Sequence, residues 1–261
     1  MTSPPALLVP ILMYHEIAQP PETTSRLAVS PDAFAAQLAY LYDEGFKTVT
    51  AAELSTVMAD AGQLPDRAVV LTFDDGYEDF HSRAMPLLER YGFTATVFVT
   101  TGWVQDAGPS AGRRPGRMLS WSQIAEAADA GIEVGAHSCQ HPQLDQLSEK
   151  LLREELYRSK AQLEDKLGSP VTGLAYPFGY SNARVRQVAR DAGHGYGCSV
   201  SNMIMSPTSD LLALPRLTVR RSMAMPAFHQ VVRGRVPMML LKDRALTKGW
   251  AMVRRARQRW T

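Results

Sequence analysis

Cysteine is scarce in this chain of 261 residues, which contains only Cys139 and Cys198. Two thiols are too few for the disulfide framework of a small secreted domain. No apolar stretch approaches the roughly 20 residues that a membrane-spanning helix needs. The N-terminal run ALLVPILMY is short, contains Pro10 and has no Lys or Arg before it, so it matches a signal peptide poorly. These absences favour a soluble, cytoplasmic globular protein that is attached at most to a membrane surface.

Charge is balanced overall but unevenly distributed. The formal net charge is +2, yet residues 232–261 hold nine Lys or Arg against the single acid Asp243, so this tail carries +8 and residues 1–231 carry −6. We therefore separate a body, residues 1–231, from a basic C-terminal tail, residues 232–261. The acidic body and the lack of a nucleic-acid motif argue against a nucleic-acid partner.

The tail also contains apolar residues at helical spacing. The residues that fall near one helical stripe are Met239, Leu246, Trp250, Val253 and Trp260. This pattern is typical of an amphipathic helix on an anionic membrane surface. It equally fits a helix that packs on the body with its charges in water.

Apolar, β-rich runs alternate with helix-like segments along the body. The predicted strands are 7–14, 68–73, 94–99, 131–136, 171–176 and 217–219, and the predicted helices are 31–45, 50–62, 78–92, 120–131, 148–168 and 181–193. Several helix-like segments open on Ser, Thr or Asp and close on Gly, which are capping residues. Such alternation predicts an α/β domain with a mainly parallel sheet and helices on its outside. No linker, repeat or low-complexity tract divides it.

Residues able to do chemistry stand where the predicted strands end. They are His15 after 7–14, Asp74 and Asp75 after 68–73, His137 after 131–136, and Pro177-Phe178-Gly179 after 171–176. Active sites of parallel α/β folds lie at the carboxyl ends of the strands. These residues are therefore expected to meet on one face.

Asp74 and Asp75 repel each other and lose hydration, so the pair is costly unless a cation or a reaction uses it. Alone, the pair also fits a turn before the next helix. His137 and His141, in HSCQHP, lie four residues apart, and Pro142 favours a loop that aims both rings at one point. Two imidazoles and one carboxylate form a common open metal site. Because successive side chains of an extended segment point to opposite sides, one aspartate can bind the metal while the other faces its water.

Taken together, TFDDGY (72–77), HSCQHP (137–142) and YPFG (176–179) resemble the motifs of the polysaccharide deacetylase family, also called carbohydrate esterase family four, in order and spacing. The matching region runs from about Leu8 to Leu217. MYH (13–15) and AYPFG (175–179) are similar to the branch that deacetylates exopolysaccharides such as poly-N-acetylglucosamine. The resemblance implies a distorted (β/α)-barrel of about seven parallel strands. It also implies hydrolysis of N-acetyl groups on an N-acetylhexosamine-containing glycan.

The resemblance further implies a metal centre. By family position, Asp75, His137 and His141 are expected to hold a divalent ion, Zn²⁺ by default, although Co²⁺, Ni²⁺ or Fe²⁺ suits the same ligands. Asp74 is then expected to act as the general base on the metal-bound water. Cys139 lies between the histidines and is more simply interpreted as a small apolar filler than as a ligand.

The YPFG motif has an implied role in binding the acetyl group. The oxyanion of the tetrahedral intermediate is expected to rest on the metal and, by analogy, on the backbone N–H of Phe178. Tyr176, Pro177 and Phe178 are expected to line the acetyl pocket.

Two family features are missing. The arginine that pairs with the base falls on Ala175, and the later Leu-x-His motif, which supplies the general acid, is replaced by LPRLTV (214–219). His15 is the candidate acid, ahead of His194 and His229, although His15 also fits a structural role at the rim. These departures leave two alternatives, the same fold acting on a small amide or imide, and a catalytically silent glycan-binding module.

Overall fold

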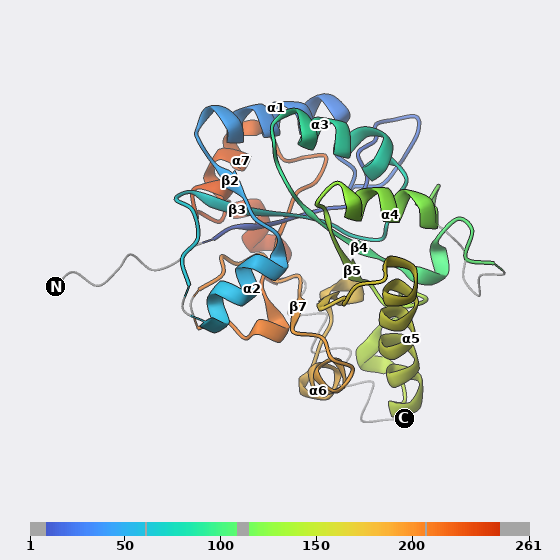
Figure 1. Cartoon of the computed structure of the whole chain (residues 1–261). Helices are drawn as coiled ribbons and strands as arrows, with labels where there is room; N and C mark the ends of the chain where they lie inside the picture. Colours follow the sequence, from blue (N-terminus) through green and yellow to red (C-terminus); the bar gives the residue numbers. More distant parts are fainter. Residues whose placement is uncertain (1–8, 61, 109–114, 207, 246–261) are drawn as a thin grey trace.

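The computed structural model describes residues 9–60, 62–108, 115–206 and 208–245 (Figure 1). Its strands are all parallel and follow the order β7-β6-β5-β4-β3-β1-β8, with β2 paired to the start of β3. The strands are β1 (Ile11–Tyr14), β2 (Lys47–Thr48), β3 (Ala68–Phe73), β4 (Thr96–Val99), β5 (Glu133–Ala136), β6 (Gly173–Ala175), β7 (Tyr196–Cys198) and β8 (Leu217–Thr218). The predicted distorted (β/α)-barrel is confirmed.

Seven labelled α-helices, apart from the helical residues 238–245, accompany the sheet in the described part of the chain. They are α1 (Pro31–Asp43), α2 (Ala51–Asp60), α3 (Met85–Arg90), α4 (Trp121–Asp129), α5 (Glu149–Leu167), α6 (Ala183–Asp191) and α7 (Met225–Val232). Ser120 and Ser148, which open two of the predicted segments, each accept a hydrogen bond from the first turn of α4 and α5, and Ser30 caps α1 in the same way. A π-helical stretch, Phe80–Ala84, runs directly into α3.

Alternate residues of each strand enter two separate apolar clusters. Leu12, Leu71 and Val97 pack outward against the helices α1 and α3 to α7, which surround the sheet (Figure 1). Ile11, Val70 and Phe98 face the interior, together with two residues of α2, which lies apart from the other helices. Gly135 allows this packing because a Cβ there would collide with the ring of Phe98. The period of two in the sequence thus separates the barrel interior from the helix layer.

Residues 214–218 close the barrel between its two edge strands. Leu214 forms a parallel bridge with Cys198 of β7, and three residues later β8 begins to pair with β1 through Leu217 and Thr218. Arg216, between these contacts, is fully buried. The side chain of Arg216 therefore enters the interior of the barrel and not the solvent.

The sequence patterns missed two strands. β2 has two residues and β7 has three, one of them Gly197, so neither presents a recognisable apolar alternation. Both depend on pairing with neighbours that are distant in the sequence. Pairing of this kind is decided by the tertiary fold.

The basic tail lies only partly within the described residues. Residues 238–245 are helical, with Leu240 buried and Asp243 paired to Arg220 at 2.8 Å. Met239 packs against the main core, whereas Leu246, Trp250, Val253 and Trp260 lie outside the described residues. Among the described helices, none has the length and apolar character needed to cross a membrane.

Candidate metal and catalytic site

A cavity of about 440 Å³ opens at the carboxyl ends of the strands. Its wall combines apolar side chains with the ionisable residues expected from the sequence. The ionisable residues on the wall are His15, Asp74, Asp75, His137 and His141, and the other lining residues include Met13, Leu27, Tyr77, Trp103, Phe178, Val200 and Thr218. Mostly apolar walls with a few convergent polar groups are typical of small-molecule and substrate sites.

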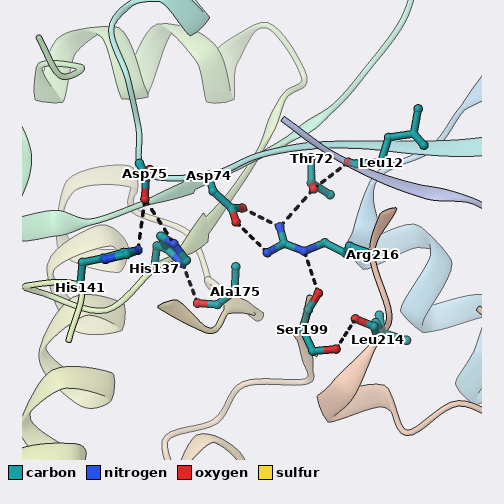
Figure 2. A network of polar contacts seen from close by, with 10 residues as sticks. All are labelled: Leu12, Thr72, Asp74, Asp75, His137, His141, Ala175, Ser199, Leu214 and Arg216. Atoms are coloured by element: carbon teal, nitrogen blue, oxygen red, sulfur yellow. Dashed lines mark hydrogen bonds and ion pairs between the residues drawn. The ribbon is translucent and has the colours of Figure 1, made fainter. Parts of the chain in front are cut away.

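Asp75, His137 and His141 bring one ligand atom each to a common point (Figure 2). The Nε2 atoms of His137 and His141 lie 3.4 and 3.3 Å from Oδ1 of Asp75. Ligands bound about 2.0–2.1 Å from a tetrahedral zinc ion stand about 3.3 Å apart, so these separations fit such an ion. Oδ1 of Asp75 is buried and has no hydrogen-bond partner in the described part of the chain. The three residues therefore fit a divalent cation.

The protonation of both histidines is consistent with metal binding. Nδ1 of His137 lies 2.7 Å from the carbonyl oxygen of Ala175, so this nitrogen carries the proton and the lone pair of Nε2 faces Asp75. Burial and the neighbouring His137 lower the pKa of His141 to about 4, which keeps its ring neutral at neutral pH. Although burial opposes the shift, the carboxylates of Asp74 and Asp75 raise the pKa of His137, so this cluster favours a positive charge between its ligand atoms, either a proton or a metal ion.

The loop that carries the histidines is held from several sides. Oγ of Ser138 accepts a hydrogen bond from the backbone N–H of His141 at 3.0 Å. The carboxylate of Glu155, on α5, accepts hydrogen bonds from two consecutive backbone N–H groups of the loop at 2.8 and 2.9 Å. Gly102 donates to the carbonyl of Cys139 at 2.7 Å, an approach that a Cβ would prevent. These contacts fix the ligands before any ion binds.

Cys139 does not belong to the ligand cluster. Its sulfur lies 3.6 Å from the hydroxyl of Thr101 and 3.8 Å from the amide oxygen of Gln162, and burial raises its pKa to about 11. The thiol therefore stays protonated and packs toward α5, as a small filler does.

Asp74 points away from the ligand cluster and pairs with Arg216 (Figure 2). Nη1 and Nη2 of Arg216 donate to Oδ1 and Oδ2 of Asp74 at 2.6 and 2.7 Å. Nη1 also donates to the hydroxyl of Thr72, and Nε donates to the carbonyl of Ser199, both at 3.2 Å. The guanidinium is thus fixed on all sides, and its fork holds the carboxylate in one orientation.

This pair sets the charge of Asp74. Burial alone would raise the pKa of Asp74, but Arg216, with His137 and His15 nearby, more than reverses this and holds the pKa well below its usual range. Asp74 is 3% exposed and Arg216 is 0% exposed, so each charge depends on the other. Asp74 is therefore ionised at neutral pH.

Sequence reasoning did not identify Arg216, although it noted that the family arginine was absent. Arg216 lies in LPRLTV, 142 residues after Asp74, and enters the barrel from the segment before β8. A signal was available, because an arginine inside an apolar, β-rich run must find a buried anion. The chain therefore supplies the missing cation from another strand.

Asp74 and Asp75 diverge for a different reason from the one expected. The prediction relied on extended backbone, but β3 ends at Phe73 and Asp75 has a left-handed φ of 75°. Ser138, His141 and Phe178 also have left-handed φ values, of 63°, 56° and 59°. Such backbone is unfavourable for residues other than glycine and persists where surrounding contacts impose it, often at functional sites.

The structure separates the three residues of the expected acetyl pocket. Tyr176 is fully buried, and its hydroxyl donates to the carbonyl of Leu212 at 2.8 Å. Neither Tyr176 nor Pro177 lines the cavity, whereas Phe178 does, with its ring 4.6 Å from that of His141.

The three candidate general acids lie in different parts of the structure. His15 lines the cavity beside Asp74 and Asp75, and its Nδ1 is buried without a hydrogen-bond partner among the described residues. His194 is buried outside the cavity, and His229 stacks on Tyr40 with ring centroids 3.8 Å apart. Only His15 of the three is on the cavity wall.

Comparisons with known proteins agree with this geometry. The model of the polysaccharide deacetylase family matches residues 61–197. The Bacillus subtilis protein YxkH is 31% identical over 233 residues, which cover 89% of this chain and 78% of that protein. The chain belongs to the polysaccharide deacetylase family, whose members are hydrolases acting on N-acetylated polysaccharides.

Two further relatives have more specific names. A Staphylococcus aureus poly-β-1,6-N-acetyl-D-glucosamine N-deacetylase is 26% identical over 201 residues, which cover 74% of this chain and 68% of that protein. The structure of the Streptococcus pyogenes deacetylase PplD in complex with acetate superposes with a TM-score of 0.78 at 29% identity and covers 89% of this chain and all of that one. The fold and the family are therefore shared with proteins named as deacetylases.

Proposed function

We propose that this protein hydrolyses N-acetyl groups on a poly-N-acetylglucosamine-type exopolysaccharide, with a divalent ion, Zn²⁺ by default, at Asp75, His137 and His141. The observation that carries the proposal is the meeting of this ligand set with the Asp74–Arg216 pair on the wall of one cavity. The Staphylococcus aureus relative supports the substrate class through its name.

The ligand set and Asp74 have different roles in the proposed reaction. A divalent ion bound at Asp75, His137 and His141 would lower the pKa of a water molecule and polarise the acetyl carbonyl. Asp74 accepts the proton of the attacking water. Arg216 keeps Asp74 ionised and oriented, although it also weakens Asp74 as a base, so catalysis relies on its fixed position.

Two further residues are assigned to stabilisation of the oxyanion and to protonation of the leaving amine. The backbone N–H of Phe178 donates to the developing oxyanion, and the Phe178 ring forms one side of the acetyl site. His15, on the cavity wall, donates a proton to the leaving amine. Replacement of His15 by Ala should lower kcat about 100-fold or more, and an unchanged rate would remove His15 as the acid.

The proposal is tested by acetate release from N-acetylated β-1,6-glucosamine oligomers. Purified protein should release acetate, chelation should stop the release, and added Zn²⁺ or Co²⁺ should restore it. Asp74→Asn is the matched control because it should bind the ion and yet release no acetate. Folded, metal-loaded protein that released none would contradict the proposal and favour a small amide substrate or a silent glycan-binding module.

A further inference from the structure

A second hollow, of about 370 Å³, has an unusual lining of three arginines and a serine, Arg26, Arg220, Arg221 and Ser222. The side chain of Arg26 makes no hydrogen bond or ion pair with any described residue. Arg221 uses Nη2 to donate to the carbonyl of Thr23 at 3.0 Å. These two guanidiniums therefore have no neutralising partner in the described chain.

Arg220 is neutralised from one side only. Its Nη1 pairs with Asp243 at 2.8 Å, while its Nε is buried and has no hydrogen-bond partner among the described residues. Arginine does not lose its proton in proteins, so burial cannot relieve the repulsion among the three side chains. An anion in the hollow would relieve it and would satisfy donors that now lack acceptors.

The basic hollow lies beside the catalytic cavity, on the same face of the barrel. Arg220 and Arg221 follow β8 at its carboxyl end, and the backbone N–H of Arg221 donates to the carbonyl of Arg26 at 3.2 Å. Leu27, next to Arg26 in the chain, and Thr218, two residues before Arg220, both line the catalytic cavity. One extended ligand can therefore occupy the hollow and the cavity together.

The cavity also borders a hollow of the reverse charge, the acidic flank. A hollow of about 530 Å³ shares Tyr77 and Pro115 with the cavity. Its ionisable lining consists of four acids and two arginines, Glu16, Glu22, Glu78, Asp79, Arg83 and Arg117. An anionic group on the substrate is thus repelled by the acidic flank and attracted to the hollow lined by Arg26, Arg220 and Arg221.

We propose that Arg26, Arg220 and Arg221 bind a phosphoryl group carried by the glycan, so that the preferred substrate is an acetylated, phosphate-bearing oligosaccharide. The proposal rests on the deacetylase function above. The fork of each guanidinium matches the oxygens of a phosphate ester, and no carboxylate lines the hollow.

The test compares one N-acetylglucosamine oligomer with the same oligomer bearing a terminal phosphate. At low salt the phosphorylated oligomer should have a kcat/KM about tenfold higher, because one charge-assisted contact suffices for that factor, and the advantage should shrink as salt is added. Arg26→Gln and Arg221→Gln should each lower the ratio of the two kcat/KM values toward one. Arg117→Gln, which removes the same charge on the acidic flank, should leave the ratio high. Equal kcat/KM values for the two oligomers in the unmodified protein would overturn the proposal.

Further measurements distinguish a phosphorylated glycan from free phosphate and from an anionic membrane surface. They also distinguish failure of this proposal from failure of the deacetylase function. Inorganic phosphate should compete with the phosphorylated oligomer more strongly than with the neutral one. Phosphatidylglycerol vesicles that bind through the same arginines, with a substrate ratio of one, would mark a membrane surface and overturn the proposal. If neither oligomer yields acetate, the deacetylase function fails, and calorimetry of phosphorylated-oligomer binding still tests the hollow. If the unmodified protein and the double variant Arg26→Gln/Arg221→Gln then bound the phosphorylated oligomer equally well, the phosphoryl-binding proposal would be overturned.

Discussion

The two ends of the barrel each hold a carboxylate inside the sheet, and the two carboxylates have different partners. At the carboxyl end, Asp74 receives two hydrogen bonds from the guanidinium of Arg216 and faces a cavity. At the amino end, Glu133 accepts hydrogen bonds from the hydroxyls of Tyr196 and Thr96 at 2.5 and 2.8 Å. It also accepts a hydrogen bond from a backbone N–H in the first turn of α2 at 2.9 Å.

The partners decide the charge of each carboxylate. The cation beside Asp74 overcomes the effect of burial and lowers its pKa, whereas burial wins at Glu133 and raises its pKa despite the neutral donors. Asp74 is therefore a fixed charge that faces a reaction site. Glu133 instead joins α2 to β4, β5 and β7, at the end of the barrel where stability and not chemistry is determined.

Loss of a metal ligand should have the largest effect. Asp75→Ala, His137→Ala and His141→Ala should each weaken metal binding by more than about 100-fold, beyond what loss of an outer partner costs. Acetate release should fall by at least about 1,000-fold, which corresponds to several kcal/mol of lost stabilisation. Metal titration and acetate assays measure both. His229→Ala is the matched control, and full metal affinity in His137→Ala would refute the ligand assignment.

Breaking the Asp74–Arg216 pair, at the carboxyl ends of the strands, should lower both stability and activity. Arg216→Met leaves Asp74 buried without its cation and should cost about 3–5 kcal/mol of unfolding free energy. The double variant Asp74→Leu/Arg216→Met should regain most of that stability and remain inactive. Urea unfolding and acetate release give the two readouts. A fully active Arg216→Met protein would show that the pair has no part in catalysis.

Breaking the hydrogen bonds of Glu133, at the amino ends of the strands, should lower stability but not activity. Glu133→Ala leaves the hydroxyls of Tyr196 and Thr96 without their acceptor and should destabilise the fold by about 2–4 kcal/mol. Glu133→Gln keeps one acceptor oxygen, so its free energy of unfolding should fall by about half as much as that of Glu133→Ala. The rate per folded molecule should match that of the unmodified protein in both variants. A selective loss of kcat would contradict the assignment of this end to structure.

A third carboxylate, Asp79, sharpens the comparison because its side chain forms no ion pair with a cation among the described residues. Burial, with Glu16 and Glu78 nearby, raises its pKa to about 6, although the backbone N–H of Ile17 and the more distant Arg83 oppose the shift. A raised native pKa contributes stability that is complete below about pH 4 and lost as pH rises through 6.

Asp79→Asn should therefore be more stable than the unmodified protein at pH 8, by about 1–2 kcal/mol, and the difference should vanish near pH 4. Urea unfolding at the two pH values measures this effect. A difference that is independent of pH would mean that Asp79 does not titrate as described.

The sequence by itself determined the helix layer, six strands and the meeting of the candidate ligands Asp75, His137 and His141. The run 68–73 matches β3 residue for residue, because apolar β-rich runs and serine caps are local signals. Asp75, His137 and His141 follow two strands that both end on the active face, so their meeting needed only a parallel sheet.

Only the tertiary structure decided the partner of Asp74, the turn at Asp75 and the direction of Tyr176. Arg216 reaches Asp74 because residues 214–218 close the barrel between β7 and β1, which depends on strand order and not on any local pattern. The left-handed φ of Asp75 and the buried hydroxyl of Tyr176 likewise follow from contacts with distant segments. Local patterns report which residues face inward, whereas pairing across the barrel decides which of those residues meet.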